Sequence, residues 1–148
     1  MALDGGGGGG GPVGSSNSFT GVSSSIELIG DHCYILPGLV VASTTIVTVA
    51  EFTSGNYYTV GRLYLNNGIP YNANIGDADM FAAYVFFNGT RVVLMSTGNA
   101  QVDSNTSTVN ELIIPPYTEV KIEMVSDVID NDAWGTLSYV GRIYRTRA

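Results

Sequence analysis

The sequence predicts an all-β protein, an antiparallel and jelly-roll-like β-sandwich of eight or nine strands. The 148 residues include nine tyrosines and five phenylalanines but only 13% charged residues, which is a composition typical of sheets. Short runs of β-branched and aromatic residues alternate with Gly, Pro, Asn and Asp at the spacing of a sandwich. No segment has the periodicity of an amphipathic helix of two turns or more. These three observations define the fold class.

Turn residues divide the chain into the expected strands. Pro37-Gly38 is expected to end one strand, with a short continuation after it. The tight connection at residues 54–56 is expected to join its two flanking strands as a hairpin. In chain order, the expected strands cover residues 25–29, 32–36 with its short continuation at 39–41, 45–53, 57–65, 80–87, 90–95, 111–114, 119–126 and 135–145.

The clearest local signal is Asn88-Gly89 between two apolar runs. This dipeptide is the preferred two-residue hairpin turn because both positions adopt positive φ. The sequence therefore predicts a hairpin between residues 80–87 and 90–95.

Alternating side chains predict which face of a strand is buried. In residues 119–126 the apolar positions point inward and the charged positions outward. In residues 57–65 and 135–145 both faces carry apolar or aromatic side chains. The predicted inward residues of 119–126 are Val120, Ile122 and Met124. Leu63 and Leu65 share one face of residues 57–65, and Leu137, Tyr139, Gly141 and Ile143 share one face of residues 135–145.

Three polar stretches are expected to be loops, at residues 66–79, 96–110 and 127–133, the last of them acidic. Loops of this length favour a Greek-key or jelly-roll sandwich. An up-and-down barrel normally uses short hairpins throughout.

Residues 1–24 are expected to form a flexible N-terminal arm, and residues 25–148 the sandwich domain. The arm contains seven consecutive glycines followed by a Ser-rich run, and this composition cannot bury enough apolar surface to fold alone.

The chain carries a net charge of −7, which opposes binding to nucleic acid or to anionic membranes. No nucleic-acid or membrane partner is therefore expected. Positive charge collects near the C-terminus at Lys121, Arg142, Arg145 and Arg147, which suits docking to an acidic protein. The N-terminus lacks the features of a secretory signal, so synthesis in a cytoplasm is expected.

The sequence offers few groups for catalysis, and no enzymatic activity is expected. Its single histidine, His32, and single cysteine, Cys33, are adjacent in an expected strand, so their side chains should point to opposite faces. No cofactor is expected, and no metal site is assigned. Calcium binding by the acidic residues of the two loops stays an open alternative. Those residues are Asp77, Asp79, Asp127, Asp130, Asn131 and Asp132.

Aromatic residues provide a second hypothesis, carbohydrate or receptor binding. Sugar rings stack on exposed aromatic faces, and Tyr71 and Trp134 are the candidate glycan contacts. A Val-Gly-Arg-apolar-Tyr pattern also occurs twice, at residues 60–64 and 140–144. We interpret it as two strands with a glycine at a close backbone approach rather than as a duplication.

Four segments resemble small virion proteins of aquatic tailed phages. They are the Gly-rich leader, Ile-Gly-Asp-His-Cys-Tyr at residues 29–34, the apolar and Pro-containing residues 113–121, and Val-Gly-Arg-Ile-Tyr at residues 140–144. The resemblance implies a capsid decoration, cement or head-fibre subunit: a β-sandwich located in the virion, often a homotrimer, whose partners are the major capsid protein or other virion subunits.

The expected capsid contacts follow from this resemblance together with the charge distribution. The arm would reach neighbouring subunits, and the C-terminal arginines would form salt bridges to an acidic capsid surface. The candidate contact residues are Gly5, Gly11, Pro12, Arg142, Arg145 and Arg147.

Overall fold

The computed structural model describes residues 24–68, 77–78, 80–97, 100–101, 106–127 and 129–145. Within these ranges the chain forms strands and no helix, which confirms the all-β prediction. The strands are β1 (Glu27–Ile29), β2 (His32–Ala42), β3 (Val47–Thr53), β4 (Tyr57–Gly68), β5 (Asp77–Ala78), β6 (Phe81–Phe87), β7 (Thr90–Ser96), β8 (Ala100–Gln101), β9 (Thr106–Ile114), β10 (Glu119–Ser126) and β11 (Asp130–Arg145).

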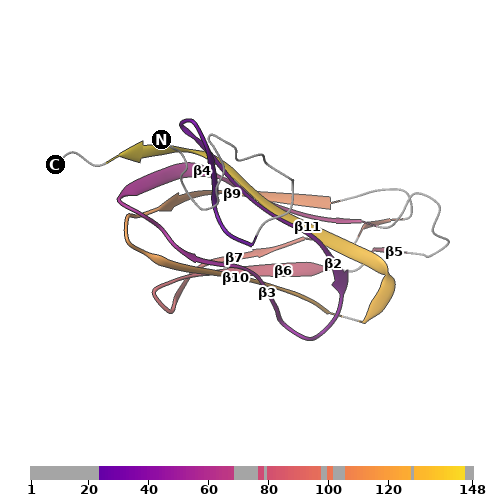
Figure 1. The fold of residues 1–148 in the computed structure, drawn as a ribbon. Coiled ribbons are helices and arrows are strands. Elements are labelled where there is room, and N and C mark those ends of the chain that lie inside the picture. Colours follow the sequence, from indigo (N-terminus) through magenta and orange to yellow (C-terminus); the bar gives the residue numbers. More distant parts are fainter. Residues whose placement is uncertain are drawn as a thin grey trace.

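Two antiparallel sheets form the body of the molecule. One has five strands in the order β1-β2-β11-β4-β9, and the other has four in the order β3-β10-β6-β7. Figure 1 shows them as two layers, with β4, β9 and β11 in one and β3, β6, β7 and β10 in the other. Among the described residues β5 and β8 form a separate two-stranded ladder. The predicted sandwich is confirmed.

The strand pairing is that of a jelly roll. β2 pairs with β11, β3 with β10, β4 with β9, and β6 with β7. The outermost strands of this set, β2 and β11, pair with each other. Each further pair lies inside the previous one, down to the β6–β7 hairpin. The nested pairs alternate between the two sheets, so the eight strands form one long hairpin wrapped around a common core.

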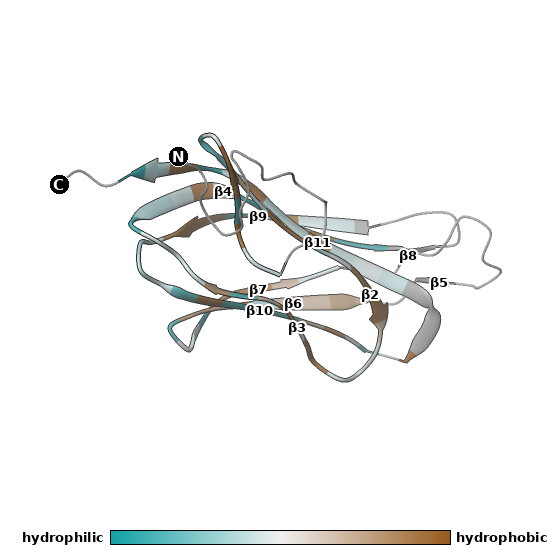
Figure 2. Cartoon of the chain, in the orientation of Figure 1, coloured by the Kyte–Doolittle hydropathy of each residue, from teal (hydrophilic) through white to brown (hydrophobic). Residues whose placement is uncertain are grey.

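The core lies between the two sheets and is filled from both by every second residue. The inward positions predicted on β10 are buried, and so are Leu63 and Leu65 of β4 and Leu137, Tyr139 and Ile143 of β11. Hydrophobic segments occur on strands of both layers (Figure 2). The largest fully buried apolar and aromatic side chains are Tyr139, Phe81, Ile35, Leu63, Leu65, Ile114, Ile122, Met124, Leu137, Val85 and Val120.

The β6–β7 hairpin forms as predicted. Phe87 lies opposite Thr90 in the ladder, and Asn88 and Gly89 have φ angles of 51° and 82°. Both turn positions therefore have the positive φ that this dipeptide accommodates.

The predicted hairpin over residues 54–56 is wrong, because β3 and β4 lie in different sheets. The connection crosses the sandwich and is held by the β9–β10 connection instead. The buried Ser54 donates its hydroxyl to the Pro115 carbonyl at 2.6 Å, and its backbone N–H to the Thr118 carbonyl at 2.9 Å. The Thr118 N–H in turn donates to Ser54 Oγ at 2.9 Å.

The predicted break at Pro37-Gly38 is also wrong, because β2 continues through it. Ile35 lies opposite Tyr139, and Gly38, with φ of 100°, lies opposite Leu137. Two residues of β2 thus face one residue of β11, which is a β-bulge. A proline is tolerated there because the bulge already interrupts the hydrogen-bond ladder.

The polar loops are shorter than predicted. β9 begins at Thr106 and β11 at Asp130, both inside stretches expected to be loops, and β4 extends to Gly68. Residues 106–114 pair with β4 along their whole length. Their polar side chains do not prevent this, because a long neighbouring strand supplies the backbone partners.

Candidate interaction surface

The outward side of the five-stranded sheet carries mostly apolar and aromatic side chains. Residues directly opposite one another in the ladders share a face, so the registers of β2, β11, β4 and β9 define this surface. We call it the aromatic face. Its apolar and aromatic residues are Tyr34, Leu39, Val41, Tyr58, Val60, Tyr64, Val109, Ile113, Trp134, Val140 and Tyr144.

Much of the aromatic face is open to solvent. Leu39 is 65% exposed and Ile113 57% exposed, and six more of its residues rank among the exposed large hydrophobics of the described chain. A soluble monomer rarely exposes apolar side chains side by side in this way. The aromatic face is therefore the strongest candidate for a binding surface.

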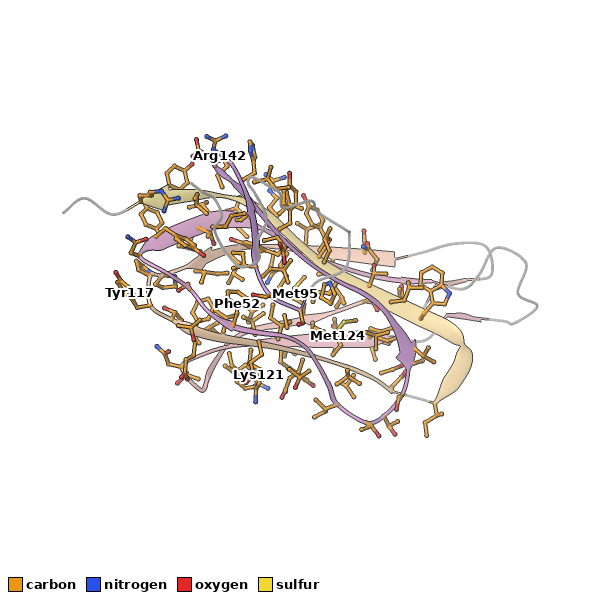
Figure 3. The ribbon with its side chains drawn as sticks, viewed as in Figure 1. Phe52, Met95, Tyr117, Lys121, Met124 and Arg142 are labelled. Carbon is orange, nitrogen blue, oxygen red and sulfur yellow. The ribbon has the colours of Figure 1, made fainter. Side chains whose placement is uncertain are left out.

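Ring stacking and ion pairs order one end of the face. The rings of Tyr58 and Tyr144 stack with centroids 5.4 Å apart. Next to them, Arg142 Nη2 lies 3.8 Å from Asp31 Oδ2, and Arg142 Nη1 lies 3.4 Å from His32 Nε2. Figure 3 shows Arg142 directed away from the sandwich. The stacked rings, the ion pair and the hydrogen bond hold the aromatic and charged side chains at this end of the face in place.

A pair of glycines lies beneath the centre of the face. Gly61 of β4 lies directly opposite Gly141 of β11. A Cβ on Gly61 would collide with the Val140 carbonyl and come within 2.7 Å of Gly141 Cα, and a Cβ on Gly141 would lie 2.6 Å from the Val60 carbonyl. The repeated Val-Gly-Arg pattern thus marks the predicted close backbone approach.

The space left by Gly61 is filled from the core side by the ring of Tyr139, whose Cζ would lie 2.9 Å from an added Cβ. The fully buried Tyr139 hydroxyl donates to the Leu112 carbonyl at 3.0 Å and lies 2.8 Å from Thr59 Oγ1. Burial raises the pKa of Tyr139 to about 12, and the hydrogen bond with Thr59 opposes the rise. This polar network positions β4, β9 and β11 relative to one another.

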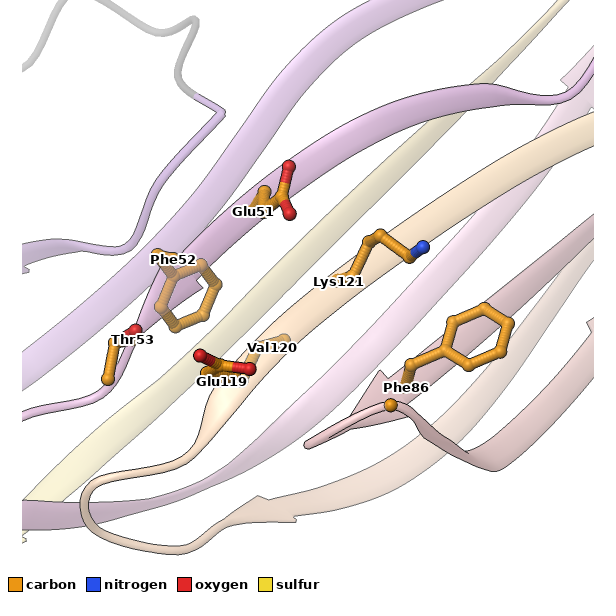
Figure 4. Close-up of a pocket in the computed structure, with 8 residues that line it drawn as sticks. Glu51, Phe52, Thr53, Phe86, Glu119, Val120 and Lys121 are labelled. Atoms are coloured by element: carbon orange, nitrogen blue, oxygen red, sulfur yellow. The ribbon is translucent and has the colours of Figure 1, made fainter.

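The outward side of the four-stranded sheet is different. Lys121 Nζ lies 3.3 Å from Glu123 Oε2 and 5.2 Å from the centre of the Phe86 ring, while Arg91 lies over Tyr84 at 5.5 Å. A pocket of about 280 Å³ lies beside Lys121 and is lined by Glu51, Glu119 and Phe86 among others. Figure 4 shows these residues. Here the cations cover the aromatic rings.

The structure places some of the predicted contact residues and not others. Arg142 and Arg145 are exposed near the end of β11, and Trp134 is half-buried on the aromatic face, opposite Val41 and Gly68. Arg145 forms no ion pair with the described part of the chain. Gly5, Gly11, Pro12, Tyr71, Arg147 and residues 1–23 of the arm lie outside the described residues.

Sequence reasoning missed the aromatic face as a whole. Its signal was present in residues 57–65 and 135–145, where the face opposite the leucines carries tyrosine and valine as well as arginine. A strand with apolar residues on both faces belongs either to a buried sheet or to an interface.

The groups considered for catalysis or metal binding do not converge in the described residues. Cys33 is fully buried and His32 exposed, so their predicted opposite orientation is confirmed. Burial raises the pKa of the Cys33 thiol to about 12, and a backbone hydrogen bond from Gly141 opposes the rise. The thiol is therefore protonated at neutral pH. Asp79 and the side chains of Asp77, Asp130, Asn131 and Asp132 lie outside the described part.

Within the described ranges no three His, Cys, Asp or Glu side chains gather at a distance suited to a metal ion. In the same ranges no helix is long and apolar enough to cross a membrane. No model of a known protein family matches the chain, and a comparison with curated proteins also finds no match.

Proposed function

We propose that this protein is a viral structural protein, a capsid decoration or cement subunit that binds the capsid surface and stabilises the particle. The observation that carries the proposal is the exposed aromatic face, because a sheet surface rich in exposed apolar and aromatic side chains is typical of subunits that are buried in an assembly. The jelly-roll topology, which recurs in viral capsid proteins, supports it by analogy. The sequence resemblance described above points in the same direction.

In this proposal the sandwich is a stiff body and the exposed arginines at the end of β11 contact the capsid. Arg145 is the described residue best suited to this contact, because it has no ion-pair partner among the described residues. An acidic capsid surface would supply that partner. The glycine-rich arm would add a second contact, and a homotrimer remains the predicted oligomer.

The proposal is tested by the protein composition of purified particles. We expect many copies of this chain in each particle and a lower melting temperature of particles from which it has been removed. Arg145→Glu should weaken rebinding to stripped particles, and more so at low salt. Arg91→Glu, on the opposite sheet, is the matched control and should rebind normally. Particles that contain no copy of this chain would overturn the proposal.

A receptor- or glycan-binding module of a phage fibre or tail is the second candidate. It is favoured by Trp134, the one tryptophan of the sequence, which is partly exposed on the aromatic face. A tryptophan in this setting can stack against a sugar ring. Binding to a glycan array that is lost in Trp134→Ala would favour this function over the first.

A further inference from the structure

We infer that a second copy of this chain docks on the aromatic face. The inference rests on the proposed role of this face as a surface buried in an assembly, and it names the occupant. Three properties of the face support a copy of the same chain over a different partner: its size, its charge balance and its chemical mixture.

The size of the face fits a protein interface. Four strands about 4.8 Å apart, each with about nine residues rising about 3.3 Å, cover roughly 20 Å by 30 Å, or about 600 Å² in projection. Side-chain relief increases the accessible area beyond the projected value. A standard interface buries about 800 Å² on each partner, so this face has the scale that a stable self-association needs.

The charge of the face is nearly balanced. Two arginines, Arg62 and Arg142, stand against three carboxylates, Glu27, Asp31 and Glu111, whereas the whole chain has a net charge of −7. Arg142 is paired with Asp31 at 3.8 Å, and Arg62 lies opposite Glu111 in the ladder. Among the described residues this face is therefore close to neutral.

This balance favours a second copy as the occupant. Two copies of a chain with a net charge of −7 repel one another overall, and a face that is close to neutral lets them meet with little local repulsion. A strongly acidic or basic partner would gain little from a face whose arginines already have carboxylate neighbours.

The side-chain mixture is also suited to packing of sheet on sheet. Ile113, Val60 and Val140 are exposed aliphatic side chains, and Tyr58 and Tyr144 form a rigid stacked pair beside them. Tyrosine and arginine are enriched at the cores of protein interfaces. In face-to-face packing the aliphatic side chains of one copy would contact the rings of the other.

The test is the mass in solution of the full chain, measured by sedimentation velocity from about 1 to 100 μM, a range that brackets the micromolar affinities of moderate interfaces. We expect a species of at least two copies. Ile113→Glu and Val140→Glu each place a charge within the face and should raise the dissociation constant at least about 30-fold. Leu94→Glu is the matched control, because Leu94 is 59% exposed on the outer side of the four-stranded sheet.

Far-UV circular dichroism and the melting temperature of each variant show that it is folded, and Ile113→Leu should associate like the unaltered chain. An unaltered chain that is monomeric at 100 μM overturns the inference, as does equal weakening by Leu94→Glu. These results are independent of the particle test. A monomer that still coats particles would contradict only the inference, and an oligomer absent from particles would contradict the proposed virion role.

Discussion

The outward surfaces of the two sheets differ, although both sheets contribute inward side chains to the same core. On the four-stranded sheet, Lys121 pairs with Glu123 and covers Phe86, and Arg91 covers Tyr84. The cations stay in water and their aliphatic stems shield the rings. Both rings are shielded in this way, although Leu94 of the same surface is 59% exposed.

On the five-stranded sheet the arginines do not cover the apolar side chains in the same way. Arg142 is directed to Asp31 and His32, while Ile113, Val60 and Val140 stay exposed. Because the fold dictates only which positions face inward, the outward residues are free to suit their surroundings. The difference makes the aromatic face the candidate binding surface of the described chain.

The two sheets also differ in their inward side. In the described residues the groups with a raised pKa, Cys33, Tyr57 and Tyr139, all belong to the five-stranded sheet. The same sheet contains the Gly61–Gly141 approach. The five-stranded sheet therefore depends on buried neutral groups and on close backbone packing. A pH change or a substitution in this sheet should lower the stability of the protein more than one in the four-stranded sheet.

High pH should have the largest effect and should act through the five-stranded sheet. Burial raises the pKa of Cys33 from 9.0 to about 12 and that of Tyr139 from 10.0 to about 12. Above pH 9 the unfolded chain loses protons that the folded chain retains, so stability is full below pH 9 and falls as the pH rises toward 12. Between its pKa in the unfolded chain and its pKa in the folded chain, each group lowers the free energy of unfolding by about 1 kcal/mol per pH unit.

Urea unfolding between pH 7 and 11.5 measures this effect. Cys33→Ala is the control, and its stability should decline less steeply between pH 9 and 10. If the two chains lost stability in parallel over that interval, the buried thiol would not be the group responsible.

Gly61→Ala should have the next largest effect, a loss of about 3 kcal/mol in the free energy of unfolding, because the new methyl group meets backbone that cannot move aside. The added Cβ collides with the Val140 carbonyl and crowds Gly141 Cα at 2.7 Å. Chemical denaturation measures the loss. Ser138→Ala, on the outward side of β11, should change stability by less than about 0.5 kcal/mol. Equal effects of the two substitutions would show that the strands can separate at little cost.

Sequence alone was sufficient where the determining contacts are local. Asn88-Gly89 specifies a hairpin through its own φ angles, and Val120, Ile122 and Met124 specify the inner face of β10 by alternation. Neither feature needs information from a distant segment.

Sequence failed where a distant segment decides the structure. Residues 54–56 resemble a hairpin turn, but Ser54 bonds to Pro115 and Thr118, more than 60 positions away, and these bonds accompany a crossing between sheets. The bulge at Pro37 likewise depends on the register with β11. The outward apolar positions of the aromatic face were visible in the sequence, but their assembly into one surface required the order of the strands.

Removing a single hydroxyl from each sheet gives the smallest and most selective comparison. Tyr139→Phe deletes the hydroxyl that bonds to Leu112 and Thr59 inside the core, and Tyr84→Phe deletes one on the outward side of the four-stranded sheet. Tyr139→Phe should cost about 2 kcal/mol, since it leaves the buried Thr59 hydroxyl without this partner. Tyr84→Phe keeps a ring beneath Arg91 and should cost less than about 0.5 kcal/mol.

Thermal and urea unfolding of both variants, each at pH 7, measure the difference. Because phenylalanine fills the same space as tyrosine, the volume of the core does not change, and the hydroxyl is the only group removed. A Tyr139→Phe variant as stable as the unaltered chain would mean that the buried network contributes nothing to holding β4, β9 and β11 together. In that case the greater sensitivity of the five-stranded sheet would come from its glycine pair alone.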